Sequence, residues 1–264
     1  MTNLQIAIFG VALIFVMTVA GSVMVYFFKN TINEKFNKIF LGFAAGVMIA
    51  ASVWSLLIPA IDMSNNQGLA GWIPAAVGFV AGGLVLLGID KLVPHFHVEG
   101  HVEEGLPSKL SMSSKLFLAM TIHNIPEGLA VGFAFGAAFL SGERAMFLAA
   151  LGLAIGIGLQ NFPEGAAVVL PLKKEYGNTN KAFGMGVISA VVEPIAAIIG
   201  ILLAYYGAGG IMMPWLLAFA AGMMIYVTVE ELIPEAHLGE HSDFGTWGLM
   251  IGFMVMMILD VALG

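Results

Sequence analysis

Cysteine is absent from the sequence, and charged residues are scarce. The missing cysteines exclude a disulfide scaffold and any metal site built from thiolates. Only 10% of the 264 residues are charged, whereas an average soluble domain has about 25%. The 10 basic residues are outnumbered by 17 acidic ones, so the chain offers nucleic-acid phosphates no basic surface. These deficits exclude an ordinary soluble enzyme, a disordered chain and a nucleic-acid-binding protein.

Hydrophobic residues make up 59% of the chain, and the mean hydropathy is +0.96. Eight apolar stretches reach the about 20 residues that a helix needs to cross a bilayer. Together they occupy nearly the whole chain, which predicts one all-α domain over 1–264 with a longer connection at about 93–113. The domain is expected to be a polytopic membrane bundle of eight transmembrane helices. The stretches are 4–28, 39–61, 72–92, 114–140, 145–171, 182–206, 212–234 and 245–263.

Glycine is abundant, with 33 residues, as expected where helices approach closely in lipid. Gly78, Gly82 and Gly83 in the third stretch are interpreted as a lipid-facing surface. Such a surface permits a homodimer without requiring one.

Lysine and arginine are distributed unevenly over the connections. Nine lysines fall after the first, third and fifth stretches, and only Arg144 falls on the opposite side. Cytoplasmic loops carry the excess of basic residues. The sequence therefore predicts a multi-pass protein with both termini outside the cytoplasm.

Two internal similarities are visible. FAAGVMIAASVWSLL (43–57) matches FAAGMMIYVTVEELI (219–233) at an offset of 176, although the two stretches run in opposite directions. HNIPEGLAVG (123–132) matches QNFPEGAAVV (160–169) at an offset of 37. The alternative is chance similarity among helices rich in alanine, glycine and methionine. We interpret the pattern as inverted repeats, helices one to three against six to eight, around a central pair of helices four and five.

Polar side chains gather near the middle of three consecutive stretches. A carboxylate at this depth costs about 2.5–3.5 kcal/mol on insertion scales. The sequence places every lysine and arginine in a loop, so no basic partner is at hand. Protonation, a water-filled path or a bound cation remain as explanations. The residues are His123, Asn124, Glu127, Gln160, Asn161, Glu164 and Glu193.

Their spacing favours a cation. Residues i and i+4 share one face of a helix, so His123 and Glu127 point together, and Gln160 and Glu164 repeat the arrangement. A proline inside each motif removes a backbone N–H and loosens the helix. One imidazole with carboxylate and amide oxygens suits zinc, with iron, manganese or cadmium as alternatives. The simpler alternative is a proline-kinked helix with ordinary hydrogen-bonded polar residues.

HNIPEG (123–128) and QNFPEG (160–165) resemble the paired signature of the ZIP (Zrt-, Irt-like) metal transporters, in particular the GufA-like bacterial branch. The resemblance extends over essentially the whole chain. It implies a transporter, without an organic cofactor, that moves divalent transition metals through the bacterial inner membrane into the cytoplasm. It also implies alternating access, in which one group of helices shifts against the rest.

The resemblance further implies a binuclear metal site. The first ion is expected on His123, Glu127, Gln160 and Glu164, with Met48 nearby as a soft ligand. The second is expected on Asn124, Glu127, Asn161, Glu164 and Glu193, with the two shared glutamates bridging. Some family members have aspartate where this chain has Asn161, which makes the second position less charged here.

Further acidic and histidine side chains lie near the ends of the predicted helices. Each alone is a typical solvated helix end, but together they are interpreted as an entrance and an exit for cations. The entrance residues are Asp62 and Asp260, and the exit residues are Asp90, His95, His97, His101, Glu230 and Glu231. The histidine run also fits a metal sensor or a storage arm.

Other functions remain as alternatives. A passive metal channel and a proton-coupled carrier using Glu127 and Glu164 fit the same residues. An intramembrane metalloenzyme fits less well, because HExxH needs a second histidine where Glu127 stands.

Overall fold

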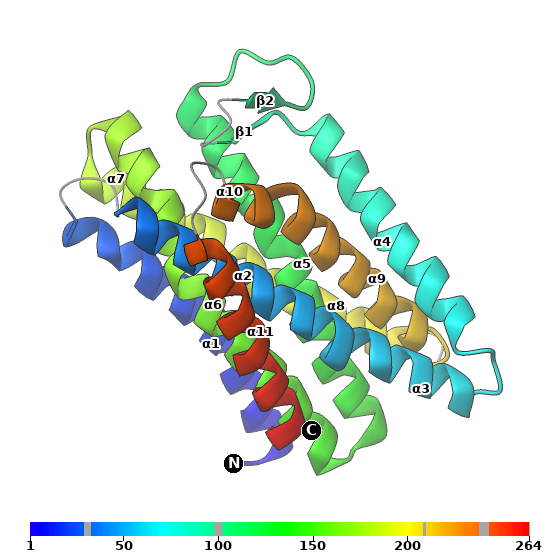
Figure 1. Ribbon diagram of the computed structural model, residues 1–264. Coiled ribbons are helices and arrows are strands. Elements are labelled where there is room, and N and C mark those ends of the chain that lie inside the picture. Colours follow the sequence, from blue (N-terminus) through cyan, green and yellow to red (C-terminus); the bar gives the residue numbers. More distant parts are fainter. Residues whose placement is uncertain (29–32, 98–101, 208–209, 238–242, 264) are drawn as a thin grey trace.

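The computed structural model describes residues 1–28, 33–97, 102–207, 210–237 and 243–263 (Figure 1). They form a bundle of long helices, which confirms the all-α membrane architecture. The first half contains α1 (Asn3–Val23), η1 (Met24–Tyr26), α2 (Glu34–Ala51), η2 (Ser52–Leu57), α3 (Ile58–Asn66), α4 (Trp72–Leu92) and α5 (Met112–Ser141). The second contains α6 (Arg144–Tyr176), α7 (Thr179–Ala190), α8 (Val192–Tyr206), α9 (Met213–Val227), η4 (Thr228–Leu232), α10 (Ile233–His237) and α11 (Asp243–Leu263).

The eight predicted spans correspond to eight long helical segments. Seven segments in the described residues are long and apolar enough to cross a membrane. The eighth is α5, whose 30 residues are ample for a crossing. The second, sixth and seventh spans are each built from successive helical pieces.

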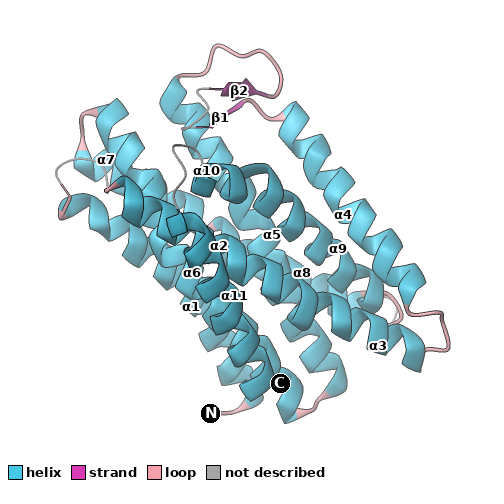
Figure 2. Cartoon of the chain, viewed as in Figure 1, coloured by secondary structure: helices cyan, strands magenta, loops and turns pink. Residues whose placement is uncertain are grey.

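The loop between α4 and α5 contains a short hairpin that the sequence does not predict. Strands β1 (His95–His97) and β2 (Val102–Glu104) pair antiparallel, with His95 opposite Glu104 (Figure 2). Strand β1 contacts α5. The backbone of the first two loop histidines is therefore held beside α5, while His101 lies outside the described residues.

The helices divide into two groups, and each group consists of two helix pairs that are related by the sequence repeat. In one group α2 packs on α11 and α4 packs on α9, and in the other α1 packs on α6 and α5 packs on α8. Exchanging helices one to three for six to eight, and four for five, maps each pair onto its counterpart. This pairing has the symmetry that an inverted repeat requires.

The repeat extends to a local irregularity. Both η2 and η4 are π-helical, and their first residues, Ser52 and Thr228, are 176 positions apart. Each hydroxyl donates to the carbonyl oxygen four residues earlier, at Met48 and Met224, over 2.7 Å. Such π segments are rare and concentrate at functional sites.

Gly78 and Gly82 do not face lipid, which corrects the sequence interpretation. Both are buried, and a side chain at Gly82 would collide with the carbonyl oxygen of Phe219 in α9. Gly83 in turn has its nearest neighbour in α9, the carbonyl oxygen of Gly222. These glycines bring α4 against α9 within one chain, so they give no support to a homodimer.

Hydrogen bonds of two basic side chains show which connections share an end of the bundle. Arg144 donates to the Met1 carbonyl oxygen over 2.8 Å, so the α5–α6 connection and the N-terminus share one end, and Figure 1 shows the C-terminus near them. Lys173 donates to the carbonyl oxygens of Val25 and Phe28 at the opposite end.

Seven of the nine lysines expected in loops lie inside helices instead, and two of these seven are buried. Lys38 is buried in the second turn of α2 and pairs with Glu34 over 2.8 Å. Lys115 is buried in the first turn of α5. Helices α2 and α5 begin before the predicted apolar stretches, because the polar residues that precede each stretch are also helical.

We expect Gly82→Ala to lower the melting temperature of the purified protein, because the added methyl group pushes α4 away from α9. Overpacking of this kind costs about 1–3 kcal/mol. Gly88→Ala on the same helix is the control, since nothing lies within 4 Å of a side chain there. Equal melting temperatures for both variants would contradict this packing.

Candidate metal centre

The two sequence motifs lie on α5 and α6, which pack against each other. Pro126 and Pro163 are inside these helices, yet both helices continue through them. The prolines therefore do not break the helices. The polar side chains of the motifs are held between α5, α6, α8 and α1.

Three amide side chains orient the centre by donating from their nitrogens. Gln160 Nε2 donates to Glu127 Oε1 over 2.6 Å. Asn161 Nδ2 donates to Thr18 Oγ1 over 3.0 Å. Asn124 Nδ2 donates to the carbonyl oxygen and the hydroxyl of Ser189 over 3.1 and 3.0 Å. Each amide nitrogen is thus occupied, and each amide presents its oxygen elsewhere.

Four oxygen atoms of this centre are buried without a hydrogen-bond partner in the described structure. They are Glu127 Oε2, Gln160 Oε1, Asn161 Oδ1 and Glu193 Oε2. Leaving a buried acceptor unsatisfied costs about 1–3 kcal/mol, and more for a charged group. Because unprotonated carboxylate and amide oxygens are acceptors, bound cations would satisfy them.

The carboxylates reinforce this requirement. Glu127 is 1% exposed and Glu193 is 0% exposed. Glu127 interacts electrostatically with both Glu164 and Glu193, which carry the same charge when ionised. Buried carboxylates of like charge are stable only when a cation binds between them or when they take up protons. The sequence-predicted residues on α5, α6 and α8 therefore come together as one acidic, amide-rich centre.

His123 has a partner that the sequence analysis placed elsewhere. Its Nε2 is in contact with Glu231 Oε1. Glu231 was expected in the exit at the inner end of the seventh span, but it is buried beside His123 and joins the two helix groups. Its neighbour Glu230 is exposed. The sequence contains one signal for the position of Glu231 inside the bundle, because this residue lies inside the repeated segment 219–233.

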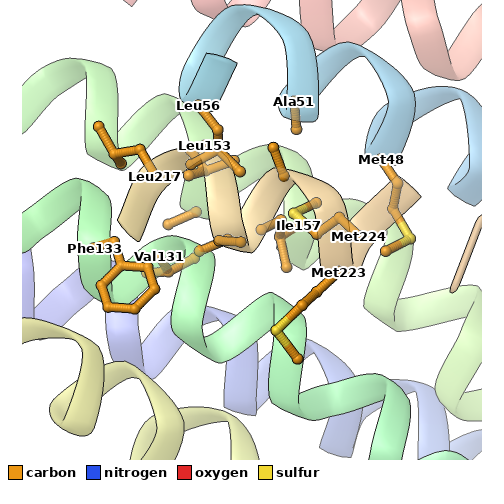
Figure 3. Close-up of a cluster of buried hydrophobic side chains, with 14 of the residues drawn as sticks. Met48, Ala51, Leu56, Val131, Phe133, Leu153, Ile157, Leu217, Met223 and Met224 are labelled. Carbon is orange, nitrogen blue, oxygen red and sulfur yellow. The ribbon is translucent and has the colours of Figure 1, made fainter. Parts of the chain in front are cut away.

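Met48 is fully buried, and its sulfur lies against a hydroxyl group. Thr228 Oγ1 is 3.6 Å from Met48 Sδ. The side chain belongs to the apolar cluster that also contains Met224 (Figure 3).

A cavity of about 200 Å³ lies toward the end of the bundle that carries the N-terminus. Asp260 lines it, accepts a hydrogen bond from Ser55 over 2.5 Å, and has Oδ2 buried without a partner in the described structure. Asp62, the other expected entrance residue, is exposed and does not line this cavity.

Apolar side chains separate the cavity from the polar centre. Along α6, Leu153 lines the cavity, Ile157 follows one turn later, and Gln160 begins the polar centre. Along α9, Leu217 lines the cavity and the buried Met224 follows. Figure 3 shows these side chains meeting between the helix groups. The path from the cavity to the centre is therefore closed by a hydrophobic layer.

At the opposite end, Asp90 is buried and accepts a hydrogen bond from the Tyr226 hydroxyl over 3.5 Å. The side chains of His95 and His97 and the whole of His101 lie outside the described residues. Their predicted exit role stays a prediction.

Acidic and histidine side chains alone do not form a ready metal site. Within the described residues, no three of them are grouped closely enough to hold an ion. The amide side chains of Asn124, Gln160 and Asn161 lie among these groups and add oxygen atoms to the centre. Gln160 and Glu127 are joined by one hydrogen bond, and each has an oxygen without a partner in the described structure. These two oxygens could bind a metal ion.

Comparison with known proteins supports the same chemistry. A family model described as ZIP zinc transporter matches residues 99–260. Zinc transporter ZIP11 of Xenopus tropicalis is 37% identical, over 98% of this chain and 97% of that protein. Zinc transporter GufA of Myxococcus xanthus is 38% identical over 85% of this chain and 86% of its own. Zinc transporter ZIPB of Bordetella bronchiseptica is 34% identical over 98% and 81%.

We expect zinc to raise the melting temperature of the purified protein, because the ion relieves the unsatisfied buried oxygens. A ligand at about 100 times its Kd stabilises by about 2.7 kcal/mol. Glu127→Gln should remove most of this shift, whereas Glu175→Gln, at an exposed carboxylate near the end of α6, should retain it. A full zinc-induced shift in Glu127→Gln would contradict the site.

Proposed function

Because the chain belongs to the ZIP zinc transporter family, we propose that it carries zinc and related divalent transition metals across the membrane into the cytoplasm. The observation that carries this proposal is the set of four unsatisfied oxygens buried among carboxylates. Cadmium, iron and manganese accept the same mixture of imidazole, carboxylate and amide ligands. The metal is the substrate, and the protein is a transporter rather than an enzyme.

The transported metal occupies a binuclear centre in this proposal. The first ion is held by His123, Glu127, Gln160 and Glu164, and the second by Asn124, Glu127, Asn161, Glu164 and Glu193. The two shared glutamates bridge the ions. Two observations support this proposal. Glu127 interacts electrostatically with Glu164 and Glu193. The adjacent amides Gln160 and Asn161 each have a buried oxygen without a hydrogen-bond partner in the described structure. We assign Met48 a place beside the first ion only after the Thr228 contact is released.

The route begins at the Asp260 cavity and ends at the lysine-rich end of the bundle. Asp260 has one oxygen free to attract a cation at the entrance. Asp62 is an outer collecting charge. Asp90, Glu230 and the histidines 95, 97 and 101 belong to the exit, whereas Glu231 lies beside His123 at the centre. Glu231 contacts His123 Nε2. In this proposal the contact competes with the ion for His123 and so favours release of the ion toward the exit.

Alternating access fits the structure better than a passive channel. The hydrophobic layer of Leu153, Ile157 and Leu217 blocks the path between the cavity and the centre. The layer joins side chains of both helix groups, so a shift of one group against the other would open it. A passive channel would need a continuous water-filled path past the same side chains.

We further propose that the protein lies in a bacterial inner membrane with both termini outside. The support is the distribution of basic residues, since nine of the ten follow odd-numbered spans.

We expect His123→Ala and Glu127→Ala each to reduce zinc uptake by proteoliposomes to the background of empty liposomes, because each removes a ligand of the first ion. Glu175→Ala, at an exposed position, is the control. Uptake would be measured with and without a pH gradient, which separates a proton-coupled carrier from an uncoupled one. Full uptake by either ligand variant, in folded protein, would overturn the proposed function.

A further inference from the structure

Thr18 is a buried hydroxyl in the middle of α1 that joins two other helices. It is 2% exposed. Its Oγ1 accepts a hydrogen bond from Asn161 Nδ2 of α6 over 3.0 Å and donates one to Glu193 Oε1 of α8 over 2.5 Å. Nothing in the sequence distinguishes this threonine from the other apolar-flanked residues of the first span.

The two hydrogen bonds of Thr18 decide which atoms face the centre. The amide nitrogen of Asn161 is turned toward α1, and its Oδ1 is left buried without a partner in the described structure. Glu193 Oε1 accepts the hydrogen bond from Thr18, and Glu193 Oε2 is likewise buried without a partner in the described structure. The hydroxyl also lies 3.1 Å from the Ile14 carbonyl oxygen, but a carboxylate is the stronger acceptor.

Thr18 also has a particular place in the inverted repeat. A side chain at Gly165 would collide with the Thr18 carbonyl oxygen, and one at Gly128 would collide with that of Glu193. These two glycines are equivalent, because they are 37 positions apart in the repeated motifs. Thr18 therefore stands in α1 where Glu193 stands in α8. The repeat supplies a carboxylate on one side of the centre and a hydroxyl on the other.

We propose that Thr18 is a positioning residue for the second metal ion, which it serves by fixing the ligand oxygens of Asn161 and Glu193. This inference rests on the proposed function. Hydrogen-bond partners of metal ligands typically account for 10–100-fold in metal affinity. Thr18 makes no direct metal bond in this arrangement, since both roles of its hydroxyl are filled by the two side chains.

The test is a zinc titration of the full-length purified protein in detergent against a competing chelator. The wild type should bind two ions, and Thr18→Val should bind the second ion 10–100-fold more weakly with the first unchanged. Thr18→Ser retains the hydroxyl and should stay close to the wild type. Ser22→Ala, one turn further along α1, removes a buried hydroxyl without a hydrogen-bond partner in the described structure and is the matched control.

The outcomes separate this inference from the proposed function. Wild-type affinity for both ions in Thr18→Val, or an equal loss in Thr18→Ser, would overturn the role of Thr18 alone. Absence of zinc binding by the wild type would overturn the proposed function and this role with it. Size-exclusion chromatography and circular dichroism establish folding, and Thr18→Ala carries the same expectation if Thr18→Val does not fold.

Discussion

Mutual repulsion among buried carboxylates is the constraint on which this structure depends. Glu127, Glu164 and Glu193 interact with one another in the interior of the helix bundle. Their burial is tolerated because amides and hydroxyls from neighbouring helices hold one oxygen of each of two of them, Glu127 and Glu193. The second oxygens of Glu127 and Glu193 have no donor in the described structure. A cation bound at the centre would satisfy these oxygens, which is the basis of the proposed function.

The inverted repeat explains how one chain surrounds such a centre. The paired motifs on α5 and α6 bring two similar sets of polar side chains together, and the outer helices repeat the same pairing around them. The repeated π segments at Ser52 and Thr228 lie in the other helix group. The His123–Glu231 contact described above joins the polar centre directly to the opposite group.

Much of this arrangement could be predicted from the sequence. Hydrophobic length predicts the spans, and helical spacing predicts which polar residues of one helix share a face. Neither gives the rotation of one helix against the next. For that reason Glu231 was assigned to the exit rather than to His123, Gly82 was assigned to lipid rather than to α9, and Thr18 was missed. Each of these depends on contacts between residues more than 100 positions apart.

The central claim is that divalent cations bind between α5 and α6 because buried acidic oxygens lack any other partner there. Anomalous X-ray diffraction from crystals of the zinc-bound protein, recorded at the zinc absorption edge, locates such ions directly. The account predicts two neighbouring peaks, bridged by Glu127 and Glu164 and flanked by Gln160 and Asn161. Zinc peaks confined to the loops, with the region between the two motifs empty, would contradict it.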